Sequence, residues 1–289
     1  MIRRVKYNEI DFAKYTKCLE NSLQKNWYAQ KEVLDQLSGN WHILVYGDYE
    51  AVMPVHLDRK LGVRFVNMPL FCQQLGIFSK EENPKINDQF QHFLNKKYLL
   101  FLYCFNQYNA FSAETGKRKN YIIPVSDYVI LRRKKYFKGR KSTAKAAQHL
   151  HYKEIELNEQ SLLFFKGNLK GLSKESDWLK LKNYLFFLSE NSSLKLCGAY
   201  FNDILISLAV LVSDKEQFSL LSLVNDEDYK NENGASFVID RILELYIHEK
   251  SFNFMGSNIR GIQVFFKSFG AELHEYAFLE NKILKRFYS

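Results

Sequence analysis

The sequence has no apolar run long enough to cross a membrane. Its most apolar stretches, residues 98–105 and 206–212, are of strand length, whereas a bilayer-spanning helix needs about 20 residues. The first ten residues include basic side chains but lack the apolar core of a secretory signal. We therefore expect a cytoplasmic protein with no membrane span.

Cysteine and histidine are few and scattered. The four cysteines form no C-x-x-C pair, and the seven histidines include no H-E-x-x-H motif, which argues against a zinc site and a disulfide-stapled fold. The sequence also lacks a P-loop, a G-x-S-x-G elbow and a complete G-x-G-x-x-G loop. It therefore predicts a reduced protein that binds no metal.

Residues that break regular structure are scarce as well, with four prolines and 13 glycines in a chain of 289 residues. Because 46% of the residues are hydrophobic, the chain can bury a large core and is neither disordered nor collagen-like. At about 100–200 residues per domain, this length favours two domains.

Two segments resemble each other, which indicates an internal duplication. Residues 41–57 are typical of a strand, a Gly-Asp turn and a second strand, and residues 194–212 repeat the pattern around an Asn-Asp turn. An offset of 154 residues places Tyr46 on Tyr200 and Tyr98 on Phe252, each in or opening an expected strand.

Helices and further strands are expected in the same order in both halves, which predicts mixed α/β sheets in two tandem units. The predicted helices are 32–37 and 86–97 in the first half, and 177–188, 235–250 and 261–269 in the second. The further strands are 98–105 and 121–131, then 152–157, 252–256 and 273–284.

A basic segment lies between the two halves. Residues 128–153 contain nine Lys or Arg and no acid, as many charges as the net +9 of the whole chain. Lys134, Lys138, Lys141 and Lys145 have the spacing of one helix face, which His149 continues. This face predicts an anion site for tRNA, coenzyme A or a nucleotide-linked precursor. A solvated basic face between domains is the alternative.

Two further segments carry candidate ligand groups. The turn 256–261, between an expected strand and helix, offers Ser257, Asn258 and Arg260 for a phosphate or carboxylate. A strand-to-helix turn with a capping residue is the alternative reading. In the first half, Gln73 and Gln74 suit a peptide or sugar acceptor or belong to a solvated edge strand, and Tyr103 ends a strand at the place corresponding to Ser257.

Two motifs resemble those of FemAB-like transferases, which consist of two GNAT acyltransferase units. Residues 135–147, KYFKGRKSTAKAA, are similar to the family's basic R-x-x-x-x-K-A helix. Residues 252–257, FNFMGS, and 265–271, FFKSFGA, look like its ending D-F-x-G-S … F-K-x-x-F-G-A, with Asn253 in place of Asp. The resemblance implies an N-terminal GNAT-like unit over 1–131, a basic connecting helix over 132–152 and a C-terminal GNAT-like unit over 153–289.

The resemblance also implies where a donor binds. GNAT enzymes cradle the coenzyme A pyrophosphate with a loop Q/R-x-x-G-x-G/A at a helix start, and here Gly234 alone matches it. Helix capping by Asn233 or Gly234 is the competing explanation. The candidate cofactor-binding residues are Asn233, Gly234, Ala235, Ser236, Lys138, Lys141 and Lys145.

The function implied is transfer of an acyl or aminoacyl group from acyl-CoA or aminoacyl-tRNA to an amine of a cell-wall, capsule or amino-sugar precursor. Such a reaction requires alignment, a base and oxyanion donors, and needs no metal. Candidates for the base are Glu227, Asp228 and Tyr276, from their place near the expected cleft. The alternative is a non-catalytic binder of RNA or another polyanion on a duplicated GNAT scaffold.

Overall fold

The computed structural model describes residues 1–281 and divides by its contacts into two compact units. Unit 1 comprises Met1–Arg118 with residues 275–281, and unit 2 comprises Lys119–His274. Strands β7 (Gly116–Ile123) and β13 (Glu272–Glu280) each contribute residues to both units. These two units are defined by contacts, whereas the predicted GNAT-like units, with bounds at residues 132 and 152, are defined by the internal repeat and the family resemblance. The predicted bounds therefore stay a prediction.

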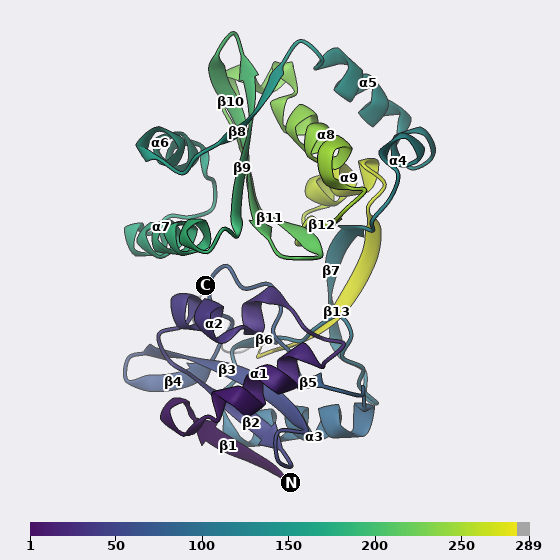
Figure 1. Ribbon diagram of the computed structural model, residues 1–289. Coiled ribbons are helices and arrows are strands. Elements are labelled where there is room, and N and C mark those ends of the chain that lie inside the picture. Colours follow the sequence, from purple (N-terminus) through teal and green to yellow (C-terminus); the bar gives the residue numbers. More distant parts are fainter. Residues whose placement is uncertain (282–289) are drawn as a thin grey trace. The chain divides into compact units, whose positions relative to one another are not determined.

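Unit 1 is an antiparallel sheet with helices packed on it (Figure 1). The sheet order is β1-β2-β3-β4, and β5 pairs with β3. These strands are β1 (Ile2–Lys6), β2 (Trp41–Tyr46), β3 (Ala51–Lys60), β4 (Val63–Val66) and β5 (Phe78–Ser79). The helices are α1 (Phe12–Glu20), α2 (Lys31–Leu37) and α3 (Pro84–Lys97), and β6 (Leu102–Cys104) pairs with β13. β2 and most of β3 are buried on both faces, so they form the centre of the core.

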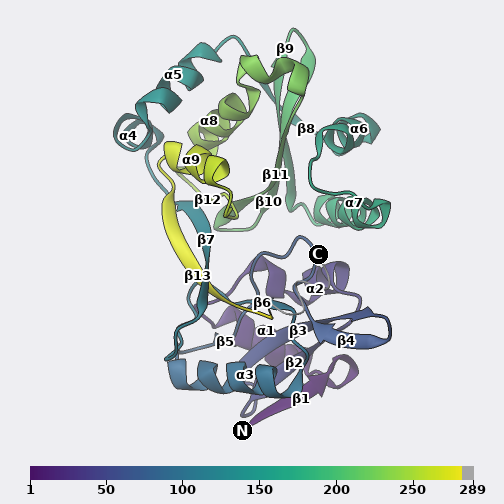
Figure 2. The same ribbon diagram turned by 180° about the vertical axis from the view of Figure 1, so that it is seen from behind.

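Unit 2 is a mixed sheet with helices on both faces (Figure 2). The order β8-β9-β10-β11-β12-β7 uses β8 (His151–Ile155), β9 (Leu194–Phe201), β10 (Ile204–Ser213), β11 (Gln217–Asn225) and β12 (Ser251–Asn253). α6 (Glu159–Asn168) and α7 (Glu175–Glu190) cover one face, and α8 (Gly234–Tyr246) covers the other. α4 (Tyr128–Lys134), α5 (Lys138–Ala146) and α9 (Arg260–Ser268) complete the unit on the α8 side.

Both units follow the order strand, two helices, a run of strands, helix and strand, with four strands in that run in unit 1 (β2–β5) and three in unit 2 (β9–β11). This order agrees with the predicted tandem arrangement of mixed α/β units. The hairpin turn at Asn202 and Asp203 is present, with positive φ at both residues as a tight hairpin requires. The predicted offset of 154 residues does not relate β6 to β12, the strands that follow α3 and α8. Tyr98 caps α3 and lies outside β6, whereas Phe252 is the middle residue of β12.

The basic segment departs from the prediction in two ways. The predicted strand 121–131 ends at Ile123, and α4 begins at Tyr128. The prediction that Lys134, Lys138, Lys141 and Lys145 share one helix face is wrong. Lys134 ends α4 and the other three lie on α5, because residues 135–137 separate the two helices. The cause is aromatic burial: the ring of Tyr136 packs edge-on against Phe269, 5.3 Å between centroids, which turns the chain inward between the two helices.

Among the other predicted elements, helices 86–97, 177–188 and 261–269 are present within two residues of their bounds, as α3, α7 and α9. The predicted closing strand 273–284 is present as β13 to Glu280, and its residues 282–284 lie outside the described part of the chain. None of the helices described has the length and apolar character that a transmembrane helix needs.

Candidate functional site

The carboxyl ends of β11 and β12 diverge in unit 2. The two strands pair in parallel only where Gln217–Ser219 meets Ser251–Asn253. β11 then continues to Asn225 alongside β10. Within residues 1–281, no strand pairs with residues 220–225 on the β12 side. An open α/β sheet binds ligands at such a point, where free backbone groups can pair with an extended ligand.

The start of α8 lies beyond β11 along the chain, and its first turn contains the predicted Asn233, Gly234, Ala235 and Ser236. Asn233 adopts a left-handed φ of 62°, and its side chain forms no cap on the helix. A Cβ atom on Gly234 would lie 2.9 Å from Cβ of Ser207, so a larger residue would push α8 off the sheet. In the described part of the chain, the N–H groups of Gly234 and Ala235 have no acceptor. Free N–H groups and the helix dipole together favour an anion.

Arg140 of α5 reaches this first turn. Its Nη1 donates to Oγ of Ser236, and its Nε donates to Oγ of Ser268 over 2.9 Å. The guanidinium lies over the rings of Phe265 and Phe269, 4.6 and 4.5 Å from their centroids. Arg140 therefore joins the two segments on which the family resemblance depends, the basic R-x-x-x-x-K-A segment and the F-K-x-x-F-G-A ending.

The electrostatics of Arg140 are unusual for a structural arginine. Burial lowers the pKa of its guanidinium from the ordinary value, although an arginine stays protonated. Within residues 1–281, no carboxylate lies within ion-pair distance of it, and the nearby Tyr136 and Asp240 offset only part of the burial. A cation beside a helix N-terminus is also opposed by the helix dipole. An anionic ligand would remove both costs.

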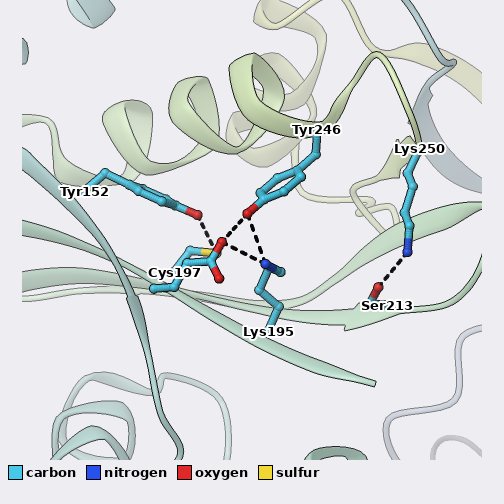
Figure 3. Close-up of polar contacts among 7 residues, drawn as sticks. Tyr152, Lys195, Cys197, Ser213, Tyr246 and Lys250 are labelled. Carbon is cyan, nitrogen blue, oxygen red and sulfur yellow. Dashed lines mark hydrogen bonds and ion pairs between the residues drawn. The ribbon is translucent and has the colours of Figure 1, made fainter. Parts of the chain in front are cut away.

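The other end of α8 is anchored to the sheet by a polar cluster (Figure 3). Tyr246, the last residue of α8, donates to the carboxylate of Glu154 on β8. Nζ of Lys195 on β9 donates to the same carboxylate oxygen over 2.7 Å and to the Tyr246 hydroxyl over 3.0 Å. Although burial opposes it, these hydrogen bonds lower the pKa of Glu154. Beside the cluster, Tyr152 donates to Cys197, whose pKa burial raises to about 12, so this thiol is no nucleophile.

The segment after β12 is a tight turn with two residues of positive φ. The Oδ1 atom of Asn253 accepts from the N–H of Met255 over 2.8 Å, and Met255 has a left-handed φ of 61°. Gly256 follows with φ of 75°, and its Cα is so close to β7 that an added Cβ would lie 2.0 Å from the carbonyl oxygen of Lys119. The close approach that glycine permits at this position is therefore made by the protein's own backbone on β7.

The three predicted ligand residues that follow lie at the entry to α9. Ser257 Oγ accepts from the N–H of Ile259 over 3.0 Å, as in a helix-entry turn. Asn258 and Arg260 are exposed, so their polar groups are accessible. Nothing in the described contacts joins these three residues to Arg140.

The predicted lysines of α5 differ in their surroundings. Lys138 and Lys145 are exposed, whereas Nζ of Lys141 donates to the carbonyl oxygen of Arg133 over 2.6 Å.

The candidate bases lie in different units and differ in their surroundings. Asp228 is exposed on a short 3-10 helix (Glu227–Glu232) between β11 and α8, and Glu227 of that helix pairs with Lys170. Tyr276 is a residue of unit 1.

In unit 1 three predicted residues, Gln73, Gln74 and Tyr276, are joined by hydrogen bonds, and the hydroxyl of Tyr103 accepts from the N–H of Gly76 in the same loop over 3.1 Å. Tyr276 is hydrogen-bonded to Gln73, and burial raises its pKa well above the ordinary value. Nε2 of Gln74 donates to Oε1 of Gln73, while Oε1 of Gln74 accepts from the N–H of Gln107 over 2.9 Å. Tyr103 donates to the carbonyl oxygen of Pro54 over 2.9 Å. These contacts fix the loop before β5.

Sequence reasoning missed two parts of these arrangements. Arg140 was counted within the basic segment without a role of its own, although its place in the R-x-x-x-x-K-A motif was a signal. The side-chain amide of Asn109 also binds the loop before β5: its Oδ1 accepts from the N–H of Ile77 over 2.9 Å, and its Nδ2 donates to the carbonyl oxygen of Ile77 over 2.8 Å. No sequence motif marks that contact, which spans 32 residues.

Among residues 1–281, no group of three or more His, Cys, Asp or Glu could hold a metal ion.

No family model matches the chain, and no curated protein matches it. Several solved structures, in contrast, are similar to the chain. The chain is similar to FemX, with a TM-score of 0.66 and 10% identity over 96% of this chain and 98% of that one. It is similar to a conserved protein of unknown function from Bacteroides thetaiotaomicron, with a TM-score of 0.59 and 13% identity over 97% of this chain and 100% of that one.

A third similar structure is a tandem GNAT protein from the clavulanic acid biosynthesis pathway, with a TM-score of 0.55 and 8% identity over 96% of this chain and 97% of that one. Alignment over nearly the full length of both chains shows that the fold is that of the tandem GNAT and FemX structures. The predicted fold and the resemblance in architecture are thereby confirmed.

Proposed function

We propose that this chain is an N-acyltransferase or aminoacyltransferase that works in the cytoplasm and takes its acyl group from a phosphate-bearing donor. The observation that carries the proposal is Arg140, a partly buried cation without a carboxylate partner in the described chain, placed at the uncapped start of α8. The tandem GNAT fold supports the proposal as an analogy only, because one fold hosts several functions.

The donor is acyl-CoA or aminoacyl-tRNA, both of which carry phosphates. In this proposal the N–H groups of Gly234 and Ala235 bind phosphate oxygens, and Arg140 turns from Ser236 toward the phosphate. Asn233 keeps the left-handed conformation that opens the helix start. Lys138, Lys141 and Lys145 add positive charge along α5 for a ligand as long as coenzyme A or a tRNA acceptor end.

The acyl arm of the donor lies along β11 in this proposal. Residues 220–225 are mostly half-buried, and their backbone faces no partner strand on the β12 side in the part of the chain described. An extended arm containing amides can hydrogen-bond to such an edge as an added strand would. The reacting carbonyl is then positioned at the carboxyl ends of the strands.

The acceptor is an amine of a cell-wall, capsule or amino-sugar precursor. Its nitrogen forms a bond to the donor carbonyl carbon, and the bond to the thiol sulfur or the ribose oxygen breaks. The amine proton passes to a base, for which the exposed Asp228 is the candidate in unit 2, and the leaving group takes up a proton. The raised pKa of Tyr276 keeps its hydroxyl protonated, so this residue cannot accept the proton. Backbone N–H groups stabilise the oxyanion. Ser257, Asn258 and Arg260 are the proposed substrate contacts in unit 2. Tyr103 and Gln74 in unit 1 are buried and hydrogen-bonded within that unit, so they are not assigned to this substrate.

The proposal is tested by donor binding to the purified protein. Acetyl-CoA, aminoacyl-tRNA and a nucleotide-linked amino sugar are each titrated by calorimetry. Arg140→Met keeps the length of the side chain but removes its charged hydrogen bonds, so we expect the dissociation constant of the bound donor to rise about 10- to 100-fold. Arg59→Met, at an exposed arginine of unit 1, is the matched control and leaves the constant unchanged.

Two outcomes contradict the proposal. One is that none of the three ligands binds. The other is that RNA binds with a steep salt dependence while mixtures of donor and amine show no transfer by mass spectrometry, which is the behaviour of a non-catalytic polyanion binder.

A further inference from the structure

The outward face of α4 combines exposed apolar and basic side chains. Val129 is 69% exposed and Ile130 is 51% exposed. Arg133 and Lys134 lie four residues further along the same helix and are exposed as well. The opposite face carries the buried Leu131, which holds α4 against unit 2. Apolar side chains on the outer face are thus not needed for the core.

The same surface continues past the end of α4. Phe137, the residue before α5, is 51% exposed. We call Val129, Ile130, Arg133, Lys134 and Phe137 the α4 surface. α4 and α5 lie on the outer side of unit 2, with α8 and α9 between them and the sheet (Figures 1 and 2).

The positive charge of the α4 surface is not neutralised. Within residues 1–281, neither Arg133 nor Lys134 forms an ion pair, and the neighbouring Lys135 reaches Glu272 only at 3.8 Å. The sequence from 128 to 153 contains no acid at all. The exposed acid nearest in sequence, Asp127, accepts from the N–H of Ile130 as the cap of α4. An anionic partner would therefore meet little repulsion.

We propose that the α4 surface docks this protein on an anionic phospholipid bilayer. Lipid phosphates attract Arg133 and Lys134, while Val129, Ile130 and Phe137 insert at the boundary between headgroups and acyl chains. A nucleic acid would use the two cations but would gain nothing from the aliphatic Val129 and Ile130, because its binding depends on phosphate charge and base stacking. The exposed aliphatic residues therefore favour a membrane.

The docking surface is separate from the start of α8, where the proposed donor site is centred. Arg140 donates to Ser236 and Ser268, whereas the side chains of the α4 surface are exposed. A bilayer bound at α4 would hold unit 2 at a membrane without using the start of α8. The two proposals can therefore fail independently.

The test is cosedimentation of the full chain with vesicles. Vesicles of equal parts phosphatidylglycerol and phosphatidylcholine are compared with phosphatidylcholine alone. We expect binding to the anionic vesicles only. Reversing two charges with Arg133→Glu and Lys134→Glu should weaken binding by at least about 25-fold, since each basic residue near an anionic surface contributes about fivefold. Val129→Ser with Ile130→Ser should weaken it at least about tenfold.

A matched control separates the surface from net charge. Lys174→Glu with Lys180→Glu changes the charge by the same amount at exposed positions at the start of and within α7, and we expect it to keep most of the vesicle binding. Circular dichroism and melting temperatures verify that each variant folds. Failure of the wild-type chain to bind anionic vesicles would overturn the proposal. So would binding that the serine pair leaves intact, because the surface would then act through charge alone, as for tRNA.

Discussion

Gly256 is the position where substitution should damage unit 2 most specifically. Alanine at this residue would have to adopt φ of 75°, and its Cβ would lie 2.0 Å from the backbone oxygen of Lys119. The left-handed conformation costs an L-residue about 1–2 kcal/mol. The clash is with backbone, which a side-chain rotation cannot relieve, and overpacking of this kind costs about 1–3 kcal/mol more.

The total expected loss of unfolding free energy for Gly256→Ala is therefore about 2–5 kcal/mol. For a domain of 150–250 residues, this corresponds to a melting temperature about 4–20 °C lower. Thermal melting followed by circular dichroism, together with urea denaturation, measures both quantities.

Gly261 provides a matched control five residues away. It lies in the first turn of α9, and a Cβ there would meet no atom within 4 Å. Because alanine is a better helix former than glycine by about 1 kcal/mol, Gly261→Ala should raise stability slightly. If Gly256→Ala melts within about 1 °C of the wild type, the turn is not held against β7 as described and the reasoning is refuted.

Three further predictions concern buried groups. Burial lowers the pKa of His42 to about 3, so the folded state stays neutral while the unfolded state gains a proton below its ordinary pKa. Stability should therefore fall as pH drops from about 6.5 toward 3, and a His42 NMR signal that titrates near pH 6.5 would contradict this. Leu188→Ala, at a fully buried residue of α7, should cost about 2–5 kcal/mol in urea unfolding, and a loss below about 1 kcal/mol would contradict the packing. Because burial raises the thiol pKa values, a disulfide reagent at pH 7.5 should label the native protein much more slowly than the urea-unfolded protein, and equal rates would contradict the burial. The cysteines concerned are Cys18, Cys72, Cys104 and Cys197.

The parts of the fold that depend on local pattern could be predicted from the sequence. α7 has apolar residues at helical spacing, and Trp178, Leu181 and Leu188 are buried on one side of it. The Asn202-Asp203 hairpin has its own turn chemistry. Both signals are contained within a few residues, so no knowledge of distant contacts is needed.

The parts of the fold that depend on distant contacts could not be predicted from the sequence. The break between α4 and α5 arises because Tyr136 packs on Phe269, which follows 133 residues later. The spacing of the lysines alone favours one continuous helix. Local helix propensity was therefore overridden by tertiary packing.

The candidate site shows the same limit. The first turn of α8 was predicted as a phosphate site from Gly234 and its neighbours, but its partner Arg140 donates to Ser268 across 128 residues. In the sequence, the lysines of α5 are more conspicuous than Arg140, because they share the spacing of one helix face. A sequence pattern does not reveal which cation turns inward.

Hydrogen exchange at the start of α8 is the most direct test of the proposed donor site. Amide exchange of residues 220–225 and 234–237 is compared by mass spectrometry in the free protein, with saturating acetyl-CoA and with saturating aminoacyl-tRNA. The proposal predicts that one of these donors slows exchange in both segments, and that Arg140→Met greatly reduces the effect at the same donor concentration. Unchanged exchange in both segments with either donor would contradict it.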